Sequence, residues 1–210
     1  MLVAPPQAPR ASAPTMIAEI DAEDGFQPGR RMTVRPLIKE IGYIDPVDAV
    51  SAFPLRPGLV LLDSALPHPR LGRWSWLATD PFGHFICANG RAAWNGMPLP
   101  GDPIKALRRQ LDCFSCATAD RSVGFRGGAS GFFSYEAGRL YERLPKPKWK
   151  GAEVPEIELW FHDVGVAFDI IDRQAFVVST GWPCGEGTAR RRRALERAAW
   201  ICCAGQGPPS

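Results

Sequence analysis

The sequence predicts an α+β fold in which mostly antiparallel sheets pack with helices. Strand-like runs and hairpin signals make up most of the chain, and helical segments are interspersed among them. The dipeptide Asn89-Gly90, which favours a tight hairpin turn, separates two short runs, and Asn95-Gly96 marks a second turn. This order of elements, without any internal repeat, is typical of an α+β domain.

The first part of the chain predicts a leader, a short helix and two strands. Residues 1–31 are rich in Pro and Ala and predict a disordered leader. Asp45 is placed to cap a helix whose first residue is Pro46. The apolar run LVLLD, residues 59–63, predicts a buried strand, and WSWLAT, residues 74–79, predicts the next one.

The middle of the chain predicts two further helices and a strand. The dipeptide Asp102-Pro103 begins a helix that carries four apolar residues on one face. These residues are Ile104, Leu107, Leu111 and Phe114. Farther on, GGASGFFSYEAGRLYERLP predicts a short aromatic strand followed by a helix over residues 135–143.

The last part of the chain predicts two longer strands and a helix. The runs ELWFHDVGVAFDII and QAFVVST form the two strands, which are joined at Asp172-Arg173. GTARRRRALERAAW predicts a helix that ends at Trp200, and ICCAGQGPPS does not fit this helix. We therefore expect a leader over residues 1–31, one domain over residues 32–200 and a tail over residues 201–210.

Composition excludes several classes of protein. The chain has 210 residues, of which 45% are hydrophobic and 22% charged, as in ordinary globular proteins. The net charge of +3 is too small to indicate a nucleic-acid partner. No window is apolar enough to span a membrane, and the first residues lack the apolar core of a secretory signal. We therefore expect a cytoplasmic protein that binds neither membrane nor nucleic acid.

The six cysteines do not form a metal-ligand pattern. Cys113 and Cys116 make one C-x-x-C, whereas a zinc site usually needs two such pairs or a Cys/His set. Cys202 and Cys203 are adjacent, and the three histidines are scattered along the chain. We interpret the thiols as structural or incidental and expect no metal; a cysteine-based metal module is the alternative.

Three charged or glycine-rich stretches receive structural interpretations. Gly127–Gly131 lacks both common phosphate-loop patterns, so we expect its glycines to let a strand pass close to another backbone. Arg190–Arg193 could contact phosphates, but four successive helical residues point all round the helix, which favours a solvated face. Glu136 and Arg139 have the spacing of a helical ion pair.

The strongest constellation of polar residues contains Asp63, Ser64 and Arg73. A carboxylate and a hydroxyl can bind an ammonium group, and an arginine can clamp a carboxylate with two hydrogen bonds. Trp74 and Trp76 occupy alternate positions of a strand, so they face the same side and could wall an aromatic slot. These residues suit a zwitterionic aromatic ligand. On these residues alone, a surface ion pair beside core tryptophans is the simpler interpretation.

Three motifs together resemble the N-terminal half of a known enzyme family. LLDSALPHPRLGRWSWLATDPF, FRGGASGFFSYEAGRLYERLP and PEIELWFHDVGVAFD occur in this order, and the resemblance covers residues 33–198. The family comprises the chorismate-utilising synthases. Component I of aminodeoxychorismate synthase (para-aminobenzoate synthase) is more similar to this chain than its sister, anthranilate synthase component I. The tail over residues 201–210 lies outside the resemblance.

The resemblance implies a partner, a metal and a ligand pocket. The full-length enzymes convert chorismate with Mg²⁺ and with ammonia from a glutamine amidotransferase subunit, and the aminodeoxychorismate branch serves folate synthesis. Their N-terminal segment carries a tryptophan pocket, in which Asp63 and Ser64 would meet the amino group of the ligand. The pocket would be lined by the run Leu71, Gly72, Arg73 and Trp74.

Two residues and the extent of the resemblance depart from the family. Asp63 stands where anthranilate synthases tend to have Glu, and His162 stands where relatives commonly have Tyr. The resemblance stops near Trp200, before the half that holds the chorismate site, the metal ligands and the catalytic residues. We therefore expect a truncated or frameshifted chain that carries no catalytic residue and is inactive alone. The alternatives are an anthranilate synthase fragment and a stand-alone amino-acid sensor.

Overall fold

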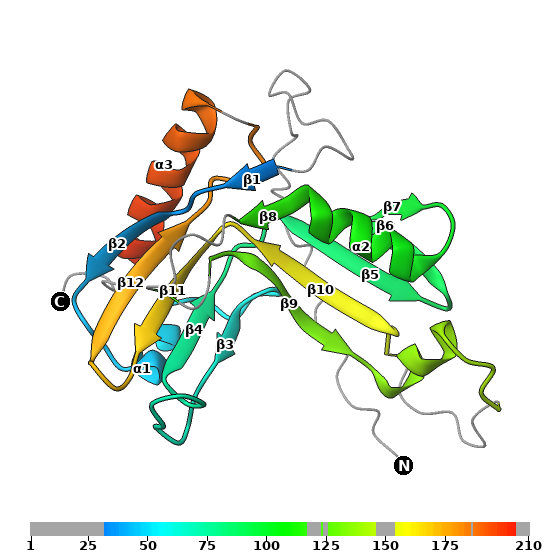
Figure 1. Cartoon of the computed structure of the whole chain (residues 1–210), viewed down its shortest axis with the longest axis horizontal. Helices are drawn as coiled ribbons and strands as arrows, with labels where there is room; N and C mark the ends of the chain where they lie inside the picture. The colour runs from blue at the N-terminus through cyan, green and yellow to red at the C-terminus, as the bar shows by residue number, and fades with distance from the viewer. Residues whose placement is uncertain (1–31, 117–122, 124–125, 146–153, 186, 205–210) are drawn as a thin grey trace, which may run out of the picture.

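The computed structural model describes residues 32–116, 123, 126–145, 154–185 and 187–204 (Figure 1). The predicted leader over residues 1–31 and the last part of the predicted tail lie outside the described residues.

Two antiparallel five-stranded sheets form the frame of the described chain (Figure 1). The first sheet has the order β2 (Leu37–Ile41), β12 (Gln174–Ser179), β11 (Val164–Asp169), β4 (Trp74–Ala78), β3 (Val60–Leu62). The second has the order β7 (Met97–Leu99), β6 (Arg91–Trp94), β5 (Gly83–Ala88), β10 (Ile157–His162), β9 (Gly128–Phe133). Strands β1 (Met32–Val34) and β8 (Phe114–Cys116) form a separate parallel pair.

Three helices of the described chain contact the strands, and a 3₁₀ helix follows β9. They are α1 (Pro46–Ser51), α2 (Pro103–Cys113), the 3₁₀ helix η2 (Tyr135–Leu140) and α3 (Thr188–Ala204). Helices α1 and α3 contact the first sheet, and α2 contacts β6 and β8. Figure 1 shows α3 along the first sheet and α2 beside the second. The prediction of mostly antiparallel sheets packed with helices is confirmed.

The turn and helix-start signals act locally as predicted. Ala88 pairs with Arg91 across Asn89-Gly90, and both turn residues have positive φ, as a two-residue hairpin of this kind requires. The Asp45 carboxylate accepts a hydrogen bond from Val47 N, and Asp102 accepts one from Lys105 N. Each aspartate therefore satisfies an amide at the open end of its helix.

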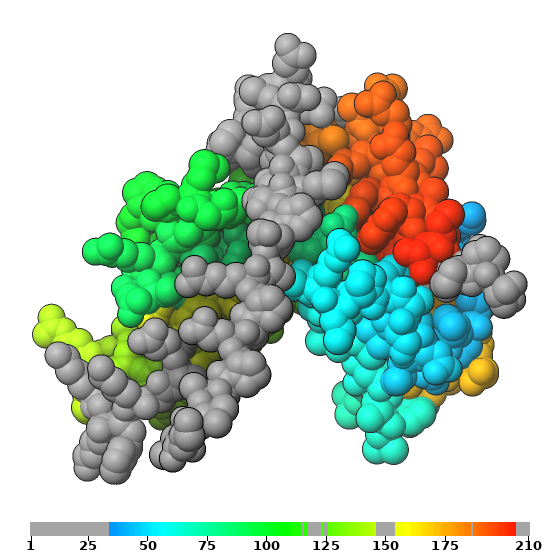
Figure 2. Space-filling model, turned by 180° about the vertical axis from the view of Figure 1, so that it is seen from behind, coloured from blue at the N-terminus to red at the C-terminus, as the bar shows by residue number. Residues whose placement is uncertain are grey.

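Two predicted helix boundaries and one predicted core position are wrong. The helix expected over residues 135–143 is the shorter η2, and Leu111 is 43% exposed instead of facing the core. Helix α3 does not end at Trp200 but continues to Ala204. Ile201 explains the extension, because its side chain is 2% exposed and packs in the same cluster as Phe53. Figure 2 shows the end of α3 against the segment that holds α1.

Separate apolar clusters stabilise the two sheets. Between the first sheet and helices α1 and α3 lies a cluster that includes Leu77, Val166 and Phe168. The second sheet and α2 enclose another, which includes Phe85 and Phe161. Burial of this kind is the main favourable contribution to folding.

The predicted close approach at the glycine-rich strand is confirmed. A Cβ atom on Gly131 would lie 2.1 Å from Glu158 O on the neighbouring strand β10, and the φ of Gly131 is 155°. Only glycine fits both the contact and the backbone conformation.

The long apolar run after Glu156 is divided between the two sheets at Asp163. We predicted one strand over this run, whereas β10 belongs to the second sheet and β11 to the first. Asp163 lies between them with no exposed surface, and its carbonyl accepts a hydrogen bond of 2.8 Å from Thr180 N. A buried carboxylate needs charged or hydrogen-bonding partners, which a continuous strand would not provide.

Arginines of α3 supply these partners. Arg197 NH2 lies 3.1 Å from one Asp163 carboxylate oxygen, and Arg193 Nε lies 3.4 Å from the other. Burial raises the pKa of Asp163, and the charges of Arg197 and Arg193 oppose this shift. Arg193 also donates to Trp182 O, and Arg190 donates to Thr180 O. The prediction of a solvated face is therefore wrong for Arg190 and Arg193, because their side chains bind carbonyls of the segment that follows β12.

We expect Arg197→Leu to lower the free energy of unfolding by about 3–5 kcal/mol, because it leaves a buried carboxylate without its nearest cation. The loss should be smaller at pH 5 than at pH 7.5. The raised pKa lets folded Asp163 take up a proton that the unfolded chain does not bind, so acidification favours the folded variant. Urea unfolding at the two pH values measures both effects.

The matched control is Arg192→Leu, whose side chain is 78% exposed and contacts Glu196 at 3.7 Å. Surface pairs of this kind contribute less than about 1 kcal/mol. Equal losses for the two variants would contradict the role given to Arg197.

Candidate functional site

The pairing of β3 with β4 places Asp63 and Ser64 beside the start of β4. Leu62 pairs with Trp76 in the ladder, so the next two residues reach Ser75 and Trp74. The Ser75 hydroxyl donates to Asp63 Oδ1 at 2.8 Å and accepts from Ser64 N at 2.9 Å. The Ser64 hydroxyl donates to Trp74 O at 2.8 Å. Three hydrogen bonds therefore fix the predicted Asp-Ser pair against β4.

Arg73 lies on the other side of β4 and faces β11. Its Nε donates to Asp169 Oδ2 at 2.8 Å, and its NH2 group lies 2.6 Å from the same oxygen and donates to Asp172. Hydrogen bonding to Asp169, followed by the charges of both carboxylates, raises the pKa of Arg73 against desolvation. Because β4 separates β3 from β11, Arg73 points away from Asp63.

The loop before Arg73 holds the other two predicted pocket residues. Gly72 forms two backbone hydrogen bonds with His68, and a Cβ atom on Gly72 would lie 2.2 Å from Leu66 O. A side chain at this position would collide with backbone, so glycine is required there. Leu71 is 89% exposed and has no part in the core.

The two tryptophans of β4 face the same side, as their spacing predicts. The ring centroids of Trp74 and Trp76 are 6.2 Å apart, and Phe176 lies 6.4 Å from Trp74. All three rings pack against a small cluster that contains Ala167 and Val178. The guanidinium of Arg73 lies 5.9 Å from the Trp74 ring centroid. These rings form an aromatic face on the side of the first sheet that α3 does not cover.

The arrangement is chemically suited to the ammonium group of a zwitterion and not to its carboxylate. Asp63 is exposed and uses one carboxylate oxygen for Ser75, so the other remains able to accept from an ammonium group. The guanidinium of Arg73, by contrast, already has two carboxylates within hydrogen-bond distance. The structure thus brings Asp63 and Ser64 to the start of β4, with Asp63 hydrogen-bonded to Ser75 on the face opposite the Trp74 ring, and it does not direct Arg73 into the same site.

Sequence reasoning missed Ser75 and Asp169, although both fix the predicted residues. Ser75 has no exposed surface and lies between two tryptophans in sequence, where strand alternation already points it to the opposite face. Asp169 Oδ1 accepts from Ile171 N and Asp172 N, so it builds the turn that receives Arg73. An aspartate two residues before such a turn is a recognisable signal for this kind of hydrogen bonding.

Two thiols in the described part of the chain, Cys87 and Cys116, are not activated. Burial raises the pKa of both Cys87 and Cys116 to about 11, so these thiols stay protonated near neutral pH. Among the described residues, no group of three His, Cys, Asp or Glu side chains could hold a metal ion. The described helices also include none that is long and apolar enough to cross a membrane.

We expect Arg73→Ala to lower the free energy of unfolding by about 2 kcal/mol, because Asp169, whose side chain is 2% exposed, loses its cation. Arg70→Ala in the same exposed loop is the matched control, since the hydrogen bond given for Arg70 comes from its backbone. Chemical denaturation of both variants tests the difference. A loss below ~0.5 kcal/mol for Arg73→Ala would show that this contact carries little energy.

Comparison with known proteins finds relatives over part of the chain, while no family model matches. Anthranilate synthase component 1 from Mycobacterium tuberculosis is 34% identical over 99 residues, which are 43% of this chain and 19% of that protein. Aminodeoxychorismate synthase component 1 from Salmonella typhimurium is 33% identical over 79 residues, which are 37% of this chain and 17% of that protein. The chain therefore spans about a fifth of the length of these relatives.

A solved structure shows the same fold. The crystal structure of anthranilate synthase component I from Streptococcus pneumoniae aligns with a TM-score of 0.57 and 18% identity, over 81% of this chain and 37% of that one. This likeness confirms the α+β prediction. Over the matched parts, the chain is similar to component I of both anthranilate synthase and aminodeoxychorismate synthase, and the similarities do not select one of them.

Proposed function

We propose that this chain forms the amino-acid-pocket domain of component I of a chorismate-utilising synthase in the cytoplasm, of the aminodeoxychorismate branch. The observation that carries the proposal is the Asp63–Ser64 pair that hydrogen bonds to Ser75 and to the Trp74 carbonyl fix at the start of β4. A carboxylate with a spare acceptor, a hydroxyl and a tryptophan suit the ammonium and ring of an aromatic amino acid. Tryptophan is the ligand that we propose.

The proposal assigns different roles to the six predicted pocket residues. Asp63 and Ser64 receive the ammonium group of the ligand, and Trp74 contributes an aromatic wall. Gly72 lets the loop approach Leu66, and Leu71 projects from that loop as a contact at the rim. Arg73 orients β4 against the β11 turn, and it would bind a ligand carboxylate only after leaving Asp169.

The complete synthase that we propose acts with a glutamine amidotransferase subunit, which supplies ammonia for the conversion of chorismate to aminodeoxychorismate in para-aminobenzoate and folate synthesis. Magnesium would belong to the catalytic half of that enzyme. The described residues offer no ligand set for it, so we assign no step of metal chemistry to this chain. The chain contributes the pocket and the sheets that support it.

The anthranilate branch is a second candidate. The match to the Mycobacterium tuberculosis anthranilate synthase component 1 covers more of this chain than the match to the Salmonella typhimurium aminodeoxychorismate synthase component 1. Asp63 favours the aminodeoxychorismate branch, because the resemblance gives anthranilate synthases the longer Glu at this position. A shorter acid holds its carboxylate closer to β3 and so changes the shape of the proposed pocket.

We expect tryptophan to bind the 210-residue chain weakly, with a Kd above ~1 mM, or a binding free energy weaker than about −4 kcal/mol. The physical reason is that Arg73 is already paired, so the ligand carboxylate lacks a free cation. Calorimetric titration measures the affinity, and Asp63→Asn serves as the control for specific binding.

A Kd near 1 µM, about −8 kcal/mol, that is lost in Asp63→Asn would instead favour the stand-alone sensor. The same titration with phenylalanine shows whether the aromatic face selects an indole ring.

We expect residues 33–198 to replace the corresponding segment of an aminodeoxychorismate synthase component I with retention of activity. The apolar faces of the sheets should fit the catalytic half of the same branch. They should fit the catalytic half of the other branch less well, because a packed core tolerates volume changes poorly. Growth without para-aminobenzoate reports the activity. Exchange into an anthranilate synthase component I, with growth without tryptophan, is the matched control. Activity only in the anthranilate chimaera would overturn the branch, and inactivity of both would overturn the proposed role.

A further inference from the structure

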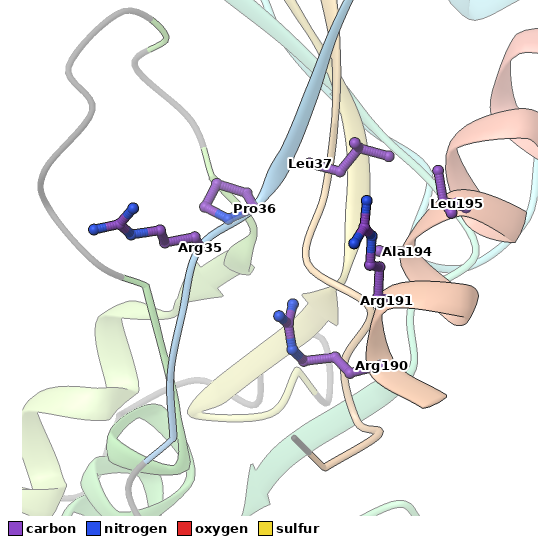
Figure 3. A pocket seen from close by; sticks show the side chains of 7 residues that line it. All are labelled: Arg35, Pro36, Leu37, Arg190, Arg191, Ala194 and Leu195. Atoms are coloured by element: carbon purple, nitrogen blue, oxygen red, sulfur yellow. The ribbon is translucent and has the colours of Figure 1, made fainter. Parts of the chain in front are cut away.

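A cavity of about 220 Å³ lies between the start of β2 and the first turns of α3, far from Asp63 in sequence (Figure 3). Its lining contains three arginines, Arg35, Arg190 and Arg191, together with Pro36, Leu37, Ala194 and Leu195. The function proposed above does not use this cavity. A volume below the 300–1,000 Å³ of pockets for drug-sized ligands suits one small ion or group.

The positive charge of this cavity is not balanced within the described part of the chain. Within the described residues, no ion pair joins Arg35, Arg190 or Arg191 to a carboxylate. The first turn of α3 carries no acidic residue. The partial positive charge of a helix N-terminus adds to that of nearby cations, so two arginines there repel the helix end unless an anion is bound.

Arg190 is held in position by the sheet. Its NH1 group donates to Thr180 O at 2.9 Å, which leaves its remaining N–H groups for another acceptor. A Cβ atom on Gly181 would lie 2.3 Å from Arg190 O, so the chain after β12 passes directly against this turn of α3. The guanidinium is therefore pre-positioned, which lowers the entropic cost of binding an anion.

The other two arginines are adjustable. Figure 3 shows Arg190 and Arg191 projecting from α3 toward the Pro36–Leu37 strand, while the guanidinium of Arg35 extends away on the far side of that strand. Arg35 and Arg191 are exposed. Exposed side chains change rotamer within nanoseconds, so both can turn toward a bound anion.

A fourth cation adds to the local field. The charges of Arg126 and Arg190 both act to lower the pKa of Cys116, although desolvation dominates and raises it. Arg190 therefore lies in a region where two guanidinium groups act on the same side chain. This region is positive on the side where β2, α3 and Cys116 meet.

We propose that this cavity binds a phosphate group, either as the free ion or as part of a small phosphomonoester. A phosphate carries nearly two negative charges near neutral pH and several acceptor oxygens, whereas a carboxylate carries one charge and two oxygens. Two guanidinium groups beside one cavity, with a third that can turn toward it, therefore match phosphate better than carboxylate. The cavity admits a single group, which distinguishes this site from a nucleic-acid surface.

The test is calorimetric titration of the 210-residue chain with inorganic phosphate in chloride buffer at constant ionic strength. Glycerol 2-phosphate and succinate are titrated in parallel. Saturable binding of one inorganic phosphate per chain is expected. If glycerol 2-phosphate also binds, the cavity accepts the phosphate group of a small phosphomonoester. If only inorganic phosphate binds, the ligand is the free ion. Succinate should bind at least 5-fold more weakly than phosphate.

Variants identify the site. Arg191→Gln should weaken phosphate binding at least 5-fold, and the double variant Arg35→Gln/Arg191→Gln at least 10-fold. Both positions are exposed and pair with no carboxylate of the described chain, so folding should be unchanged. Arg192→Gln is the matched control, because it removes the same charge from the next residue of α3, outside the cavity lining. It should change affinity less than 2-fold.

Three outcomes would overturn the proposal: no saturable binding of phosphate, equal affinity for succinate, or equal loss in Arg192→Gln and Arg191→Gln. None of them bears on the amino-acid pocket, because Asp63 and Ser64 belong to neither the cavity nor the variants.

Discussion

The buried carboxylate of Asp163 is the constraint on which the arrangement of the described chain depends. The backbone passes from the second sheet to the first at this residue. The position of Asp163 therefore fixes the geometry of the junction between β10 and β11. Its charge has no exposed surface and requires cations, which α3 supplies through Arg193 and Arg197. One side chain thus couples the junction of the sheets to the docking of the last helix.

The geometry of both the Asp63–Ser64 site and the arginine-lined cavity depends on this junction. Strand β11 leads from Asp163 to Asp169, which holds Arg73 and the start of β4. Helix α3, anchored by its second and third turns on Asp163, presents its first turn to β2 and so positions Arg190. Arg73 and Arg190 differ in what they can bind, because Arg73 is paired with carboxylates, whereas Arg190 donates to a carbonyl and to no carboxylate of the described residues.

Local features of the fold could be predicted from sequence because their causes are local. Asp45 and Asp102 cap helices within three residues, and Asn89-Gly90 closes a hairpin across two. Contacts between distant segments could not be predicted. Arg73 and Asp169 are 96 residues apart, and nothing in the arginine run of α3 indicates which members face Asp163. The Asp63–Ser64 pair was recognisable as a motif, but the Ser75 hydroxyl that fixes it was hidden between tryptophans.

The junction also contains a neighbouring group with the opposite response to pH. Burial lowers the pKa of His162, whose Nε2 lies 2.8 Å from Gly58 O. Below pH ~6.5 the unfolded chain protonates this histidine while the folded chain resists, so its contribution to stability falls with pH. The pKa of Asp163 is raised, so the folded chain binds a proton more readily than the unfolded chain, and its contribution rises as pH falls. Because the pKa shifts of the two residues have opposite signs, their contributions to stability change in opposite directions on acidification and partly offset each other.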